Sequence, residues 1–182
     1  MSVANADELR RVLAEPRALG RCLARHASGM RCWVELFGRT LGRFGPPQDL
    51  AVAARLVGDN ARHMLLLRER ASALGADPDG YRAPPVGAVI YQRLEGLDEA
   101  SGMAAFALGS LDHFSELLAI YRSVADHDTC VVIDEIQADV DAHRALLGGL
   151  VGSGGHALRA EAQRLYEERE PIEVEGYARQ TL

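Results

Sequence analysis

The feature that most constrains this fold is the spacing of apolar residues, which recur every three or four positions in four long stretches. In residues 17–44, apolar side chains recur every three or four positions from Leu19 to Leu41. That spacing is typical of an α-helix with one buried face. The same period predicts three more long helices, over residues 49–74, 98–124 and 129–147. No stretch of useful length alternates as a strand would, so we expect an all-α fold.

The connections between these stretches indicate how the helices are arranged. Gly45-Pro46-Pro47 ends the first stretch, and the polar turn at residues 126–128 joins the last two. Short connections of this kind place consecutive helices antiparallel. A longer connection with several prolines starts at Gly75, and a short helix is expected within it at residues 89–94. The pattern predicts an antiparallel four-helix bundle, made of two hairpins and a crossover.

The two ends of the chain add shorter elements to this bundle. We expect a short helix over residues 7–14 and a last helix over 157–168, with an extended tail from Pro171 onward. The length of 182 residues fits a single domain with its own core. We expect the bundle at about residues 17–147, and the C-terminal helix and tail at 156–182.

Charge and hydropathy bear on the partners and the location of the chain. The net charge is −6 and acidic residues are spread along the sequence, which argues against nucleic acid as a partner. The most apolar stretch, residues 100–111, is shorter than the roughly 20 residues of a membrane span. The N-terminus lacks an apolar signal core. The three cysteines form no CxxC pair, so neither a disulfide framework nor a zinc knuckle is indicated. We expect a cytoplasmic protein without membrane contact.

Two segments share one arrangement of acid and histidine. Asp59 lies four residues before His63 in GDNARH, and Asp139 lies four residues before His143 in ADVDAH. Together with the helix spacing, this pattern resembles the ferritin-like superfamily. There the second helix of each hairpin carries an acid, a Glu, two further residues and a His. The resemblance implies a bundle with a crossover and a di-iron or di-manganese site, held by four carboxylates and two histidines.

The sequence departs from that ligand set. Asn60 and Val140 stand at the two Glu positions. Asp112 fits the carboxylate position of the third helix. Trp33 lies near the matching position of the first helix, where the nearby Glu35 is expected to face outward. A carboxylate-bridged metal pair would lack oxygen ligands and negative charge, so we favour no cofactor.

The residues that remain fit proton transfer better than metal chemistry. We expect a small-molecule enzyme of specialised biosynthesis with an eroded di-metal site. It would reuse the bundle cavity for a cyclisation, isomerisation or elimination. In this interpretation His63 and His143 exchange protons and Asp112 orients one of them. Asn60, Trp33 and Val140 would contact the substrate.

Two alternatives remain open. One is an oxidase or oxygenase that holds iron or manganese with His63, His143, Asp112 and possibly Asp139 or Glu35. The other is a non-catalytic helical interaction module in which Asp112 bonds to His113. Asp59 is interpreted as a surface ion-pair partner of neighbouring arginines, and His26 as a core residue. A homodimer fits such a bundle, but the sequence does not indicate its interface.

Overall fold

The structure, a computed structural model, describes residues 3–81, 85–152 and 154–179, and the side chains of residues 6–81, 88–152 and 154–169. Every regular element in these ranges is a helix, which confirms the all-α class. The elements in chain order are α1 (Val3–Leu13), α2 (Pro16–Thr40), the 3₁₀ helix η1 (Leu41–Arg43), α3 (Pro47–Ala73), α4 (Pro85–Glu95), α5 (Ala100–Val124), α6 (His127–Gly148) and α7 (Gly155–Arg179).

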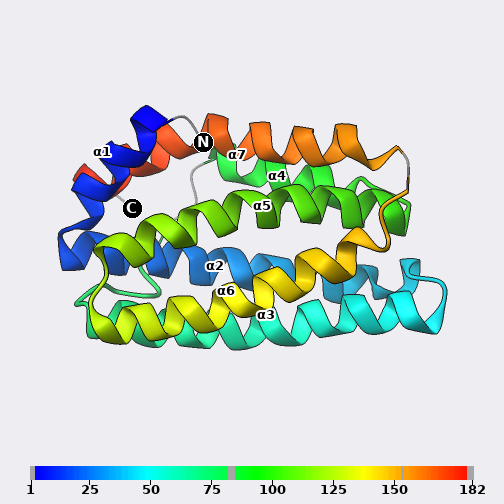
Figure 1. Cartoon of the computed structure of the whole chain (residues 1–182), viewed down its shortest axis with the longest axis horizontal. Coiled ribbons are helices and arrows are strands. Elements are labelled where there is room, and N and C mark those ends of the chain that lie inside the picture. Colours follow the sequence, from blue (N-terminus) through cyan, green and yellow to red (C-terminus); the bar gives the residue numbers. More distant parts are fainter. Residues whose placement is uncertain (1–2, 82–84, 153, 180–182) are drawn as a thin grey trace.

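The long helices form two antiparallel hairpins (Figure 1). Helices α2 and α3 pack along one another, and so do α5 and α6. The hairpins meet where α3 lies against α6, while α2 and α5 stand farther apart. The connection between the hairpins contains α4, which packs against α2, α5 and α7. Helix α7 returns along α5 and runs parallel to it.

Local sequence signals account for the helix ends. The Glu15 carboxylate accepts hydrogen bonds from the backbone N–H groups of Arg17 and Ala18, and Pro16 takes the first helical position of α2. Asp126 caps α6 by accepting from the N–H of Thr129 at 2.8 Å. These contacts satisfy N–H groups that have no partner within the helix.

Helix α5 forms the centre of the molecule. Each residue from Met103 to Ser110 is buried, as expected for a helix that is apolar nearly all round. By length and composition α5 could cross a membrane, but 78% of its most apolar window is buried inside the protein. Packing in the core therefore accounts for its apolar character.

The prediction of an extended C-terminal tail was wrong. Helix α7 continues to Arg179 and passes through Pro171. A proline inside a helix removes one hydrogen bond and costs about 3 kcal/mol. Helix α7 packs against α1, α2, α4 and α5, and we attribute the continuation to this packing. Residues 180–182 of the tail lie outside the described part of the chain.

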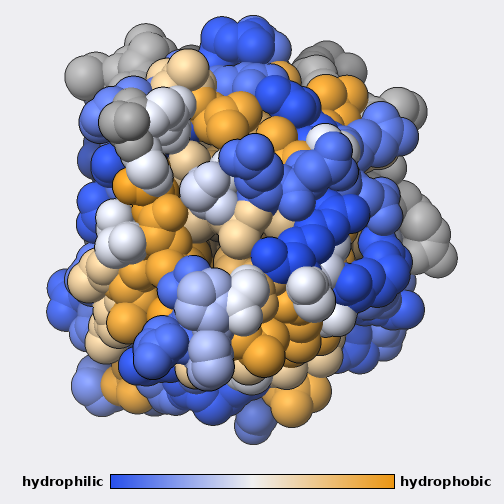
Figure 2. Space-filling view, turned by 90° about the vertical axis from the view of Figure 1, so that its right-hand side faces the viewer, coloured by the Kyte–Doolittle hydropathy of each residue, from blue (hydrophilic) through white to orange (hydrophobic). Residues whose placement is uncertain are grey.

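The bundle end that holds the connections after α2, α4 and α6 is seen in Figure 2. Apolar and hydrophilic residues are interspersed over this face. Partly buried apolar residues pack against the core at this end, among them Leu41, Leu97, Leu150 and Val151. The core cluster that they cover includes Phe37, Phe106 and Leu147.

Helices α5 and α7 approach each other closely at Gly109. A Cβ atom at this position would lie 2.2 Å from the backbone oxygen of Arg159 and 2.9 Å from the Cβ of Ala162. Backbone atoms cannot move aside as a flexible side chain can. A side chain at residue 109 would therefore push α7 away from the core.

We predict that Gly109→Ala lowers the free energy of unfolding by about 1–3 kcal/mol, because it overpacks the α5/α7 contact. Gly38→Ala is the matched control, since Gly38 is exposed in α2 and a Cβ there meets nothing within 4 Å. The control should gain about 0.5–1 kcal/mol from helix propensity. Urea denaturation of both variants measures the difference, and equal stabilities would contradict the close contact.

Candidate functional site

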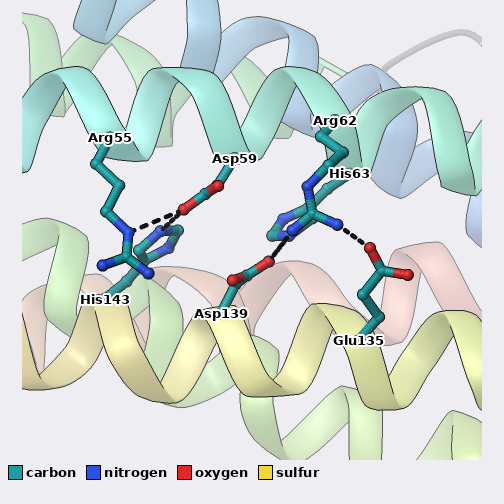
Figure 3. A network of polar contacts seen from close by, with 7 residues as sticks. All are labelled: Arg55, Asp59, Arg62, His63, Glu135, Asp139 and His143. Carbon is teal, nitrogen blue, oxygen red and sulfur yellow. Dashed lines mark hydrogen bonds and ion pairs between the residues drawn. The ribbon is translucent and has the colours of Figure 1, made fainter.

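Two histidines and two aspartates bond across the contact between α3 and α6. Because the helices are antiparallel and each carries the Asp–His pair one turn apart, each His meets the Asp of the other helix (Figure 3). His63 Nε2 lies 2.9 Å from Asp139 Oδ2. His143 Nε2 lies 2.8 Å from Asp59 Oδ2. We call these four residues the His–Asp quartet.

The quartet runs from the protein interior to its surface. The histidine side chains are only 1–2% exposed, and the carboxylates 19–22%. Arg55 donates to Asp59 at 3.4 Å, which confirms that Asp59 forms an ion pair. Arg62 instead bridges from α3 to α6, where it bonds Asp139 and Glu135. Each carboxylate thus lies between a buried imidazole and a more exposed guanidinium.

Burial and hydrogen bonding set the protonation of these groups. Burial lowers the pKa of His63, although the hydrogen bond and charge of Asp139 oppose this shift. Burial would raise the pKa of Asp59, but the hydrogen bonds and charges of His143 and Arg55 together outweigh it, so the pKa of Asp59 is lowered. A carboxylate only accepts hydrogen bonds, so Nε2 of each ring donates. In each ring, Nδ1 is the other nitrogen.

A cavity of about 800 Å³, a volume that includes its open mouth, lies beside the quartet. Residues of α2 and α5 line most of it, at the place where these two helices stand apart. Tyr91 of α4 and Tyr166 of α7 contribute from the outer side. Asn60 of α3 and His143 of α6 contribute from the inner side. Helices of both hairpins thus line the cavity.

Only one half of the quartet reaches this cavity. His143 lines it, and so do the predicted substrate-binding residues Asn60 and Trp33. His63 is equally buried and equally bonded to an aspartate, but it does not line the cavity. The ring centres of the two histidines are 6.4 Å apart. The two halves are similar in bonding and differ in access to a bound molecule.

A second group of polar side chains lines the cavity from α2, α5 and α7. It consists of Arg25, His26, His113 and Arg169, all at most 6% exposed. Arg25 Nη1 lies 2.9 Å from both ring nitrogens of His26. His26 Nε2 also lies 2.7 Å from the hydroxyl of Tyr121.

Both histidines of this basic group are held neutral. Burial lowers the pKa of His26 well below its usual value, and the charges of Arg25 and Arg169 lower it further. Burial and the same two arginines bring the pKa of His113 down to about 3. A neutral imidazole can accept a hydrogen bond from an arginine, as an imidazolium cannot.

Sequence reasoning missed most of this group. It treated His26 as a core residue and did not consider either arginine. The signal was present in part, because His26 falls on the inner stripe of the first helix, next to Arg25. Arg169 could not be placed from the sequence, since the path of α7 depends on tertiary packing.

Asp112 lies apart from the quartet. Its Oδ1 accepts from Arg144 Nε at 2.9 Å and its Oδ2 from Arg159 Nε at 2.6 Å. It thereby joins α5 to α6 and α7 and does not line the cavity. Asp59 and Asp139 hold the histidines that Asp112 was expected to orient. His113 is not a hydrogen-bond partner of Asp112 either. Its ring stacks on that of Tyr166, with the ring centres 5.0 Å apart.

Val140 also lies away from the cavity, since it belongs to the core cluster that includes Leu23 and Ile136. Glu35 is half exposed and bonds to Arg31, which confirms that it faces outward.

Within the part of the chain that the structure describes, no three His, Cys, Asp or Glu side chains converge as metal ligands would. With Asn60 and Val140 at the Glu positions, the residues present do not fit a two-metal centre.

Comparisons with protein-family models, with characterised proteins and with solved structures give no match for this chain. The resemblance of the two Asp–His segments to the ferritin-like superfamily therefore stays a prediction. A function has to be inferred from the quartet, the cavity and the basic group themselves.

The lowered histidine pKa values predict acid sensitivity. In the unfolded chain, the His113 side chain binds a proton near its ordinary pKa of about 6.5. In the folded protein it binds a proton only near its lowered pKa of about 3. Between these values the unfolded chain holds more protons, so stability is full above pH 6.5 and falls as the pH falls. His113→Phe should reduce this slope by about 1.4 kcal/mol per pH unit between about pH 6 and pH 4. Urea titrations across this range measure it, and an unchanged slope would contradict the neutral state of His113.

Proposed function

We propose that this chain is a small-molecule enzyme that performs non-redox acid–base chemistry in the cavity between α2 and α5. The observation that carries the proposal is His143, a buried imidazole bonded to Asp59 that lines the cavity together with Asn60. A histidine oriented by a carboxylate and exposed to a bound molecule is the usual arrangement of a general base.

In the proposed mechanism, Asp59 accepts the Nε2–H of His143 and fixes the tautomer of the ring. Nδ1 of His143 then removes a proton from the substrate. Asp59, whose pKa is lowered, remains ionised and stabilises the imidazolium that forms. Return of the proton to another substrate atom completes an isomerisation, and its transfer to a leaving group completes an elimination.

The other cavity residues have binding roles in this proposal. The Asn60 side chain can donate a hydrogen bond to a substrate oxygen, where negative charge grows as a proton leaves. Trp33 and Tyr91 lie edge to face with ring centres 6.4 Å apart and offer apolar surface. A cyclisation, isomerisation or elimination in specialised biosynthesis fits such a site, because each needs shape and proton transfer without an electron carrier.

We further propose a relation to ferritin-like bundles. The two antiparallel hairpins, the connection through α4 and the mirrored Asp–His pairs support it. The cavity speaks against the non-catalytic alternative, in which the bundle centre is simply packed. The donor set speaks against a two-metal oxidase, since neither Asn60 nor Val140 supplies a carboxylate.

The two halves of the quartet allow a matched test. Purified protein is incubated in D₂O with pools of small organic acids, ketones and amides, and deuterium uptake at carbon is followed by mass spectrometry. We expect uptake into at least one compound. His143→Gln should slow this uptake by roughly 10²–10⁴-fold, the usual contribution of a general base.

His63→Gln is the control, because His63 has the same burial and an equivalent Asp contact but does not line the cavity. It should leave the exchange rate within a few-fold of the wild type. Thermal unfolding of both variants checks that they lose similar stability. Equal losses of exchange in the two variants, or full exchange in His143→Gln, would refute the role of His143.

A further inference from the structure

His113 of α5 is a buried polar side chain that the proton transfer described above does not use. It is only 5% exposed and lines the cavity. Within the described part of the chain, its ring nitrogens have no hydrogen-bond partner. Neither nitrogen is among the polar atoms that are fully buried without a partner, so both reach open space. An unpaired polar group in a buried ring is costly, and a ligand in the cavity would supply the missing partner.

Packing holds the His113 ring in place. The ring stacks on that of Tyr166 of α7, with 20° between the two planes. The adjacent residue Asp112 ties the same turn of α5 to α6 and α7 through its bonds to Arg144 and Arg159. A group that is oriented before a ligand arrives is suited to precise recognition.

His113 and His143 lie at about the same level of the bundle. Each is the chain neighbour of one partner in an ion pair between α5 and α6, since Asp112 Oδ1 lies 2.9 Å from Arg144 Nε. Neighbouring residues of a helix differ by only about 1.5 Å along its axis. Because both histidines also line the cavity, one small molecule can contact both.

Asn60 lies at this level too, because its neighbour Asp59 bonds His143 across the α3/α6 contact. Its side-chain amide also has no hydrogen-bond partner among the described residues, and it lines the cavity. Two neutral donors, an amide and an imidazole, are thus placed beside the general base.

We propose that the substrate is a carbonyl compound whose oxygen accepts a hydrogen bond from His113 while His143 removes a proton from the adjacent carbon. This inference rests on the proposed function insofar as His143 is the base. A neutral imidazole that polarises a carbonyl group is an effective partner for such a base.

The step balances without an electron carrier. Nδ1 of His143 takes the proton, and the electron pair of the C–H bond forms a C=C bond. The pair of the carbonyl double bond moves to the oxygen, which becomes an enolate that His113 stabilises while keeping its own proton. Return of the proton to carbon restores the carbonyl group, and in D₂O this step places deuterium at that carbon.

The electrostatics of this wall agree with a growing negative charge. Burial and the charges of Arg25 and Arg169 lower the pKa of His113 to about 3, so its ring is neutral and one nitrogen carries a hydrogen to donate. The positive potential that disfavours an imidazolium favours an enolate oxygen at the same ring.

Ketones and hydrocarbons of the same skeleton test the inference on the intact protein. The pairs are cyclopentanone with cyclopentane, acetophenone with ethylbenzene, and 2-indanone with indane. Each is added at about 0.5 mM, where a ligand with a Kd of about 1 mM fills about a third of the sites. NMR of protein with ¹⁵N-labelled histidine follows the ring nitrogens, and His113→Phe identifies the His113 signals. We expect at least one ketone to shift these signals and its hydrocarbon to leave them unchanged.

Deuterium exchange beside the carbonyl group tests the role of His113 in the reaction. His113→Phe should slow the exchange of the bound ketone by roughly 10²–10³-fold, the usual loss when one donor to a developing oxyanion is removed. Phenylalanine retains an aromatic ring against Tyr166. His156→Phe is the matched control, because His156 is exposed on α7 and does not line the cavity. It should exchange each ketone as the wild type does.

Ketones that leave the His113 signals unchanged would overturn the inference, and so would hydrocarbons that shift them equally. Exchange in His113→Phe within a few-fold of the wild type would overturn it as well. If this variant fails to fold, contacts with the Tyr166 ring protons identify the His113 signals, and the wild-type comparison still decides.

The outcomes separate the two proposals. Exchange that needs His143 and not His113 would sustain the enzyme and refute the carbonyl site. Ketone-dependent shifts at His113 without any exchange would sustain the carbonyl site and refute proton removal by His143.

Discussion

The contact between α3 and α6 is the interaction on which the rest of the structure depends. It joins the two hairpins along one edge through the His–Asp quartet, while α2 and α5 remain apart on the other side. A four-helix bundle in which all neighbours pack equally would fill its centre with side chains. Here the opening between α2 and α5 leaves the cavity, and α4 and α7 cover it from outside. The two covering helices therefore complete the site as well as the fold.

Burial of the quartet needs every polar atom to be bonded, because an unpaired buried polar group is costly. The crossed pairing gives Nε2 of each ring a carboxylate partner, and Arg55 and Arg62 bond to the two carboxylates from the more exposed side. Such a network specifies the register of α3 against α6, since a shift by one residue would separate both pairs. The same rigidity suits a general base, whose ring must be held in one orientation before the substrate arrives.

The helices and the mirrored Asp–His segments could be predicted from the sequence, because both are local and periodic. The crossed pairing itself could not, since Asp59 has neighbouring arginines on its own helix and those account for it without any partner on α6. Asp112 shows a similar limit. Its helix position fits a bundle carboxylate, but its partner Arg159 lies on α7, and the course of that helix is decided by tertiary packing beyond a proline. Arg25 and Arg169 form one group only after α2 and α7 are brought to the same cavity.

The two positions that depart from the ferritin-like pattern explain why the site is asymmetric. Asn60 and Val140 each stand three residues before a histidine, yet Asn60 lines the cavity and Val140 packs in the core. Valine seals its side of the α3/α6 contact with apolar surface, whereas asparagine keeps a polar group where a ligand can reach it. The quartet is thus nearly symmetric in its bonds and asymmetric in its surroundings. This asymmetry is why the proposed chemistry falls to His143 alone, since of the two histidines only His143 lines the cavity.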